Sequence, residues 1–265
     1  MKNYIYILIL SIVFSSCQDV IELDVASKAS KLVVDGWIDS DSVPKIYLYI
    51  SQPYFENKEY PKATGAIVTL NDGTNNVNLT ESAAGSGFYS SNAMKGTVGK
   101  TYTLTIQYEN KTYTSVSTMP KTIAQFDSIY FRPLPFGKPG QAPKIVTNFA
   151  YQEYPEKGNC YMARFSRNGE MDLKKLNFTD DQFINGNHIT DVFVGEEVFS
   201  GDTIRLEAYG ITKEYFGFLN QIISNEYQQQ GLFSPPIAPY KGNISNDALG
   251  FFRTSGMIAK DTIVP

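Results

Sequence analysis

The residues most able to do chemistry are few, and a cysteine near the amino terminus has the clearest setting. The first three residues carry one positive charge, residues 4–14 are apolar apart from one serine, and Ser15 and Ser16 precede Cys17. This order of regions is typical of a secretory signal peptide. Small residues directly before a cysteine favour a bacterial lipoprotein box, in which the thiol is diacylated and the peptide is cleaved before it. We therefore predict a signal peptide over residues 1–16 and a lipid on Cys17.

The apolar run is too short to cross a membrane by itself. Eleven residues in a helix span about 16 Å, roughly half of a hydrocarbon core about 30 Å thick. More than one acyl chain makes anchoring stable, so we expect residues 17–30 to form a lipidated tether. Acidic residues follow closely in "CQDVIELD", which favours the surface-exposed face of an outer membrane over its periplasmic face. An ordinary cleaved signal peptide with an incidental cysteine is the alternative.

The remaining groups that are typical of catalytic or metal sites lack partners in the sequence. Cys160 lies in "EKGNCYMARF" without a nearby histidine, so we expect a buried thiol rather than a nucleophile. His188 is the single histidine, and with Asp180 and Asp181 it makes a poor transition-metal set. No serine is marked out as a partner of His188 for triad chemistry. We predict no catalytic residue, no metal site and no cofactor.

Three short motifs spell parts of known signatures outside their usual context. Gly99-Lys100-Thr101 resembles the end of a phosphate loop, but Met94 replaces the first glycine and a strand pattern follows. Residues 42–45 spell S-x-x-K around a proline without the partner motifs. Residues 85–87 lack the third glycine of a dinucleotide loop. Each is better explained as a turn, and only paired carboxylates for glycoside hydrolysis stay open.

Charge and composition fit an exported, β-rich protein and exclude nucleic-acid binding. The formal net charge is −4, and removal of residues 1–16 would take away Lys2 alone among the charged residues, which gives −5. Nucleic-acid binding needs clustered Lys and Arg, which an acidic chain of this kind does not supply. The chain also has 18 Tyr and 17 Phe but one Trp, so aromatic packing is a central feature.

Five aromatic residues gather near one predicted turn and could contact a partner. They are Tyr47, Tyr49, Tyr54, Phe55 and Tyr60, interleaved with polar residues. A flat apolar face with a hydroxyl suits both sugars and protein surfaces. The simpler explanation is aromatic packing between neighbouring strands, and we keep both.

Residues 31–120 have the period of strands rather than of helices. In "KTYTLTIQYENKTYTSVS" apolar and polar residues alternate, and residues 109–111 turn the chain into the next strand. "AIVTLNDGTNNVNLTE" is two strands around an Asp72-Gly73 turn. Some seven short strands without a helical stretch predict an immunoglobulin-like β-sandwich over residues 31–120.

Residues 121–265 predict a second β-rich domain that carries one packed α-helix. The pattern pauses near residues 120–126 and then gives strands such as "KIVTNFAYQEY" and "GDTIRLEAYGI". The helix is expected near residues 213–229, with Thr212 as its amino-terminal cap and Glu214 in its first turn. The segment "ALGFFRTSGMIAKDTIV" is expected to provide closing strands.

Ordered blocks run through nearly the whole chain: "LVVDGWI", "GAIVTL", "GFYSS" with "GTVGKTYTLTI", and "NISNDALGFFRTSG". Together with the signal segment and Cys17 they resemble the family catalogued as domain of unknown function 4249, which consists of Bacteroidota-type outer-membrane lipoproteins. The resemblance implies an outer-membrane location and, from the genetic neighbourhood of family members, a role beside TonB-dependent transport. It carries no catalytic residue to this chain, because none is established for the family.

In four places an aspartate is followed by a serine or threonine and then by an aliphatic residue. This triplet resembles the O-glycosylation acceptor pattern of this bacterial group. The acceptor hydroxyls would belong to Ser42, Ser128, Thr203 and Thr262. Triplets this short also recur by chance, so these four positions are hypotheses.

The sequence as a whole favours a non-catalytic outer-membrane lipoprotein, a binding or assembly accessory of a TonB-dependent transport complex. Its partners would be the outer membrane, through the lipid on Cys17, and a TonB-dependent β-barrel receptor. A surface adhesin or structural module is one alternative, and an unrecognised hydrolase is another. An adjacent TonB-dependent receptor gene would favour the first interpretation over the others.

Overall fold

The protein is mainly β, with fifteen strands and one helix in the part of the chain that the structure describes. The computed structural model describes residues 29–53, 59–123, 125–133, 144–171, 177–228 and 240–265. The predicted signal peptide, Cys17 and most of the tether lie outside these residues. None of the described helices is both long and apolar enough to cross a membrane.

Seven strands from the first half of the chain share one core. They are β1 (Leu32–Asp39), β2 (Lys45–Ile50), β3 (Ile67–Asn71), β4 (Asn76–Glu81), β5 (Phe88–Ser90), β6 (Thr101–Tyr108) and β7 (Lys111–Thr118). Side-chain alternation builds the core: in β6, Tyr102, Leu104 and Ile106 are buried while the residues between them are not. The predicted strand pattern of this region is therefore confirmed.

Both hairpin turns expected from the sequence are present. Asp72 Oδ1 accepts hydrogen bonds from the backbone N–H groups of Thr74 and Asn75 between β3 and β4. Glu109 and Asn110 join β6 to β7 with φ angles of 48° and 61°, the left-handed conformation that a two-residue hairpin loop requires at both positions.

The sheet of the first half curves so that β7, its last strand, comes to lie against the strand at the other end of the same order. The strand order is β15-β1-β2-β5-β4-β3-β6-β7, where β15 (Leu249–Ile263) comes from the carboxyl terminus. The hydroxyls of Ser117 on β7 and Thr254 on β15 form a buried hydrogen bond of 2.8 Å. The backbone N–H of Ser245 donates to the carbonyl of Thr114 on β7. Part of the block "NISNDALGFFRTSG" thus closes this layer of the fold.

The second half of the chain forms two sheets that face each other. Its strands are β8 (Ser128–Pro133), β9 (Ile145–Gln152), β10 (Cys160–Arg167), β11 (Glu170–Met171), β12 (Asn177–Asp180), β13 (His188–Glu197) and β14 (Thr203–Ile211). One sheet has the order β13-β9-β8, and the strands β11, β10, β14 and β15 continue the larger sheet, with β12 beside β10. A second apolar core, which includes Phe149, Phe165 and Leu206, fills this half of the molecule.

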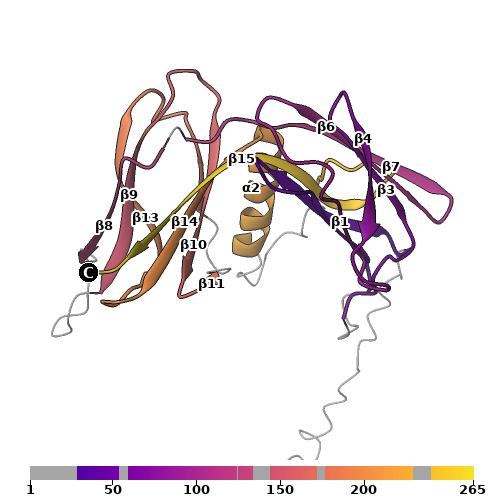
Figure 1. Cartoon of the computed structure of the whole chain (residues 1–265), viewed down its shortest axis with the longest axis horizontal. Helices are drawn as coiled ribbons and strands as arrows, with labels where there is room; N and C mark the ends of the chain where they lie inside the picture. The colour runs from indigo at the N-terminus through magenta and orange to yellow at the C-terminus, as the bar shows by residue number, and fades with distance from the viewer. Residues whose placement is uncertain (1–28, 54–58, 124, 134–143, 172–176, 229–239) are drawn as a thin grey trace, which may run out of the picture.

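Strand β15 belongs to both halves of the molecule. Its residues 249–255 pair in parallel with β1, and residues 256–263 pair antiparallel with β14 (Figure 1). At the changeover the segment after Pro120 crosses the sheet over Gly210 and Gly256. A Cβ atom on Gly210 would lie 1.7 Å from the carbonyl oxygen of Lys121, so this crossing requires a glycine. The predicted domain boundary near residues 120–126 stays a prediction, and β15 connects the regions on its two sides.

The helix α2 (Lys213–Gln228) lies between the two β regions (Figure 1). Thr212 caps it as predicted, since its Oγ1 accepts the backbone N–H of Tyr215 at 3.2 Å. One side of the helix packs on a small core that contains Cys160 and Leu219. The ring of Tyr215 meets Phe251 of β15 at a centroid distance of 5.0 Å. The helix therefore joins the second half to the sheet of the first.

Candidate binding site

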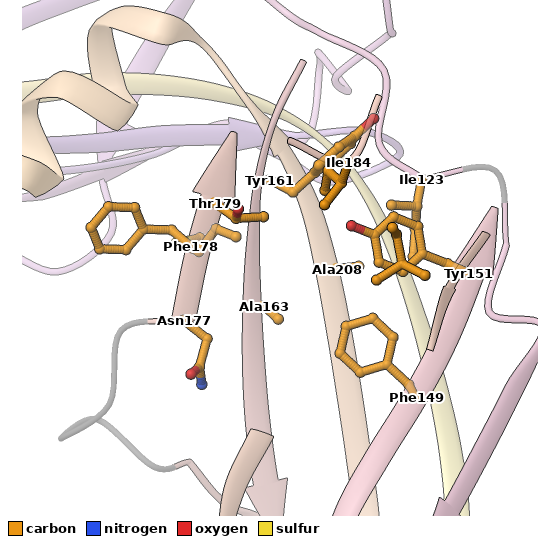
Figure 2. A pocket seen from close by; sticks show the side chains of 12 residues that line it. Ile123, Phe149, Tyr151, Tyr161, Ala163, Asn177, Phe178, Thr179, Ile184 and Ala208 are labelled. Carbon is orange, nitrogen blue, oxygen red and sulfur yellow. The ribbon is translucent and has the colours of Figure 1, made fainter. Parts of the chain in front are cut away.

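A cavity of about 370 Å³ lies between the facing sheets of the second half (Figure 2). It is lined mainly by apolar and aromatic side chains: Ile123, Phe149, Tyr151, Tyr161, Met162, Ala163, Asn177, Phe178, Thr179, Ile184, Ile189 and Ala208. We call it the inter-sheet cavity. Its volume falls within the range of about 300–1,000 Å³ that is usual for small-molecule sites.

Strand alternation explains which side chains reach the inter-sheet cavity. Phe149 and Tyr151 are two residues apart on β9, and Tyr161 and Ala163 are two residues apart on β10. Side chains two residues apart in a strand share a face, so each strand presents a pair to the space between the sheets. The small side chain of Ala163 leaves room where larger residues would fill the core.

A buried carboxylate stands behind the cavity and is surrounded by donors. Glu153 is 1% exposed. Its Oε1 accepts hydrogen bonds from the hydroxyl of Tyr161 at 2.9 Å and from Asn159 Nδ2 at 3.2 Å, and its Oε2 accepts the backbone N–H of Gly186 at 2.5 Å. Because a buried charge without partners is costly, these donors are what allow the carboxylate to lie here.

The two tyrosine hydroxyls of the cavity have different partners. Burial, and then the neighbouring Glu153, raises the pKa of Tyr151 to about 12. Burial and the hydrogen bond to Glu153 also raise the pKa of Tyr161. Both phenols are therefore neutral near pH 7. Within the described residues the hydroxyl of Tyr161 is bound to Glu153, whereas no partner is found for that of Tyr151. The Tyr151 hydroxyl is thus available to a ligand.

The walls of this cavity are mainly apolar and aromatic and suit the binding of an uncharged apolar body. The thiol nearest in sequence, Cys160, belongs to the small core beneath α2. Burial, followed by Asp180 and Asp181, raises its pKa to about 11, so it is a neutral thiol. The expectation that Cys160 is buried and free is confirmed.

The groups considered for a metal site lie apart in the structure. His188 Nε2 lies 2.9 Å from Asp127 Oδ2 at the surface. Asp181 instead accepts the backbone N–H groups of Gly158 and Asn159. Within the described residues, no three His, Cys, Asp or Glu side chains gather in a way that could hold a metal ion.

The predicted aromatic contact region is placed in part. Tyr47 and Tyr49 lie half-buried on β2, and Tyr60 is 59% exposed in the segment after it. Tyr54 and Phe55 lie outside the described residues. The structure thus supports cross-strand aromatic packing for Tyr47, and it leaves Tyr60 open to a partner.

Tyr47 is the centre of a stacked row on the outer face of the first sheet. Its ring stacks on Trp37 of β1 at 5.7 Å and on Phe88 of β5 at 4.5 Å. Tyr49, further along β2, lies under the ammonium group of Lys62 at 4.5 Å. We call Trp37, Tyr47, Tyr49 and Phe88 the aromatic row.

The four hypothetical glycosylation hydroxyls lie at strand ends or in turns. Ser128 begins β8 and Thr203 begins β14, and both are exposed. Ser42 in the turn before β2 and Thr262 near the end of β15 are half-buried. Glycosylation at these positions stays a prediction.

The sequence held a signal for Glu153 that the motif search did not use. In "NFAYQEY" the residues Phe149, Tyr151 and Glu153 follow one another at spacing two, so a strand places the acid on the apolar face. An acid in the apolar register of a strand indicates a buried, hydrogen-bonded carboxylate. Ala163 and Ala208 carried no comparable signal, because the space beside them depends on the distance between the sheets.

Comparison with known proteins gives one family. The family model described as Domain of unknown function (DUF4249) matches residues 18–257. No curated protein matches the chain. The matched residues include the inter-sheet cavity and the aromatic row.

Proposed function

Since the chain belongs to the DUF4249 family, a family described without an activity, we propose its function from its geometry. We propose that it is a non-catalytic lipoprotein of the outer membrane, anchored through Cys17. It binds a ligand or partner on behalf of a TonB-dependent transport complex. The observation that carries the binding role is the inter-sheet cavity, which has neutral aromatic walls and the hydroxyl of Tyr151, for which the described residues provide no partner.

The lipid anchor rests on the sequence, in which Ser15 and Ser16 precede Cys17 after a short apolar run. Two proteins held in one membrane have a raised effective concentration, so a weak interface suffices to keep them together. A tethered accessory can therefore serve a β-barrel receptor without a large contact area.

The aromatic region is the proposed contact with that receptor. The aromatic row offers flat, half-buried rings on an outer sheet face, and Tyr60 adds an exposed ring close to Tyr49 through the bridge between Tyr49 and Lys62. Aromatic residues are enriched at the centres of protein interfaces. Loops at sheet ends commonly carry such contacts.

We also propose that the first half is an immunoglobulin-like sandwich with residues 249–255 of β15 as an additional strand. The closure between β7 and β15 through Ser117 and Thr254 supports two packed layers. In such sandwiches the strands of the two layers cross at about 30°. An experimental structure in which they cross near 90° would contradict this arrangement.

The anchor is tested with the full chain and its Cys17→Ala variant. Metabolic labelling with a fatty acid should mark the native chain and leave the variant unlabelled, as precursor or released protein. Labelling of the variant at the level of the native chain would refute the anchor.

The partner is tested by mild crosslinking in the membrane followed by purification of the tagged chain. We expect a large β-barrel to co-purify. Tyr60→Ala should reduce its yield, and Phe183→Ala serves as the matched control because Phe183 is 86% exposed in the other half. Repeated recovery of the chain without a barrel, or equal losses in both variants, would overturn the proposal.

A further inference from the structure

A second cavity, of about 320 Å³, lies where the two halves meet, between β1, β10, β15 and α2. We call it the junction cavity. Its lining includes Asp35, Trp37, Arg164, Tyr215, Phe218 and Arg253. Trp37 also ends the aromatic row. The lining residues come from both halves, so the cavity exists only when the whole chain is folded.

Strand alternation places charged residues in this cavity. Val34 on β1 and Phe252 on β15 point into the core of the first half. Their neighbours Asp35, Trp37 and Arg253 therefore lie on the opposite face of the sheet. Tyr215 and Phe218 of α2 and Arg164 of β10 line the cavity on that face, which leaves a space with polar and aromatic walls.

One of the two arginines is already satisfied within the protein. Arg253 is 4% exposed, and its Nη1 lies 3.0 Å from Asp39 Oδ1. It also donates a hydrogen bond to the hydroxyl of Ser255. Its guanidinium lies 5.0 Å from the ring centre of Tyr209. Arg253 is thus a structural group.

In the part of the chain that the structure describes, the other arginine makes no direct contact with a carboxylate, although its charge acts on Asp35 and Asp39. Arg164 is half-buried and lies 5.5 Å from the centre of the Tyr209 ring. Glu207 is opposite it on β14, but that carboxylate accepts hydrogen bonds from Arg205 and from the Tyr209 hydroxyl. Within the described residues, no ion pair or hydrogen bond involves the Arg164 side chain. An arginine keeps its charge in proteins, so this one favours an anion in the cavity.

The remaining walls define the body of the ligand. Phe251 meets Tyr215 at 5.0 Å and Phe218 at 5.1 Å between ring centres, and Trp37 lies on the sheet side. These rings favour a flat apolar group. Asp35 is exposed on the same lining and repels a second negative charge, which disfavours dianions and polyanions.

We propose that the junction cavity binds a small aromatic monocarboxylate. Its carboxylate pairs with the fork of the Arg164 guanidinium, which matches two oxygens at once, and its ring lies among Trp37, Phe218 and Phe251. This site is separate from the inter-sheet cavity, and it does not depend on the proposed transport partner.

The ligand class is tested with the full chain in detergent and two ligands of equal shape. Trp37 is the single tryptophan of the chain and lines the cavity, so its fluorescence reports binding there. Phenylacetate should give a saturable change, and phenylacetamide should bind about tenfold more weakly or less, because it lacks the charge. Equal affinity for the two, or no saturable change with phenylacetate, overturns the proposal.

The arginine is tested with a matched pair of variants on one strand. Arg164→Met should weaken phenylacetate binding about tenfold and leave phenylacetamide binding unchanged. Arg167→Met is the control, since Arg167 is also half-buried but lies on the other face of β10 and donates to the carbonyl of Glu197. If Arg164→Met does not fold, Arg164→Lys is used, and it should weaken phenylacetate binding through loss of the fork. Native affinity in a folded Arg164 variant, or equal weakening in the control, overturns the assignment.

Discussion

The inter-sheet cavity and the junction cavity are similar in size and rich in aromatic residues, yet they differ in whether charged side chains line them. Beside the inter-sheet cavity, the carboxylate of Glu153 is buried and accepts hydrogen bonds from Asn159, Tyr161 and Gly186. The junction cavity keeps Asp35 and Arg164 on its lining, and Arg164 makes no salt bridge or hydrogen bond among the described residues. The inter-sheet cavity therefore presents no charged group to a ligand among its described lining residues, whereas the junction cavity presents both a carboxylate and a guanidinium group.

The difference follows from which face of a strand each cavity uses. The inter-sheet cavity lies between two inner faces, where alternation places apolar residues such as Phe149 and Tyr151. The junction cavity lies on the outer face of β1 and β15, where Asp35 and Arg253 alternate with buried residues, and Tyr215 and Phe218 of α2 line its other side. A sheet face that carries charged residues can therefore become a binding site when a helix from a distant part of the chain packs over it, and no sequence motif is needed.

The largest effect is expected from removing the structural arginine of the junction. Arg253→Met would leave Asp39 buried without its ion pair, which should lower the free energy of unfolding by about 3–5 kcal/mol. Arg164→Met should lower it by less than about 1 kcal/mol, because Arg164 forms no salt bridge with any residue that the structure describes. Urea denaturation of both variants measures the two values. Equal losses would contradict the claim that Arg253 stabilises the fold and Arg164 does not.

The free energy of unfolding of Arg253→Met should depend on pH in a characteristic way. Burial raises the pKa of Asp39, and Arg253 partly offsets this effect. Without Arg253 the folded-state pKa rises further above the unfolded value. The stability that comes from the protonated carboxyl is then complete at low pH and is lost as the pH rises through the folded-state pKa. Arg253→Met should therefore be closer to native stability at pH 4 than at pH 8; a constant difference would contradict this explanation.

The inter-sheet cavity predicts a smaller loss of stability from a single hydroxyl. Tyr161→Phe removes a donor from the buried carboxylate of Glu153 and should cost about 1–3 kcal/mol. Tyr151→Phe is the matched control and should cost less than about 0.5 kcal/mol, because its hydroxyl has no partner among the described residues. Thermal unfolding compares the two. Losses of equal size would mean that the donors around Glu153 do not set the neutrality of this cavity.

Filling the neutral cavity should change binding with little change in stability. Ala163→Leu places a larger apolar side chain in the inter-sheet cavity and should weaken the binding of indole, an uncharged ligand, by about tenfold, near 1.4 kcal/mol. Phenylacetate binding at the junction should be unchanged. Calorimetric titration of both ligands gives the result, and a parallel loss of both would show that the two cavities are not independent.

The smallest expected effect concerns Cys160, the first residue of β10, directly before the positions of that strand that line the two cavities. With a pKa of about 11, about one thiol in a thousand is ionised at pH 8, against about a quarter for a free cysteine. Iodoacetamide at pH 8 should therefore label native Cys160 slowly and unfolded chain fast. Rapid labelling of the native chain would show that the core under α2 is open.

The sequence predicted the elements of this fold better than their arrangement. Local signals were sufficient for the alternating strand β6, for the turns at Asp72 and at residues 109–110, and for the Thr212 cap of α2. The closing segment was expected to provide closing strands, and it forms a single strand, β15, that pairs with β1 on one side and with β14 on the other. Pairing between β1 and β15 joins residues over two hundred positions apart, and no local pattern specifies such a partner.

The candidate sites show the same limit. The acid in the apolar register of "NFAYQEY" could have indicated Glu153. The junction cavity could not have been found, because Asp35, Arg164 and Tyr215 come together only through sheet order and the position of α2. Of the five aromatic residues predicted as a contact region, the structure describes three: Tyr47 and Tyr49 are half-buried in the aromatic row, and Tyr60 is exposed.

A crystal structure with 4-bromophenylacetate tests most directly whether charge, rather than aromatic lining, decides where an aromatic acid binds. The anomalous signal of bromine marks the ring without ambiguity. We predict a bromine peak in the junction cavity, with the carboxylate in hydrogen-bond contact with Arg164. A peak in the inter-sheet cavity beside Tyr151, or no peak in either cavity, would contradict this account.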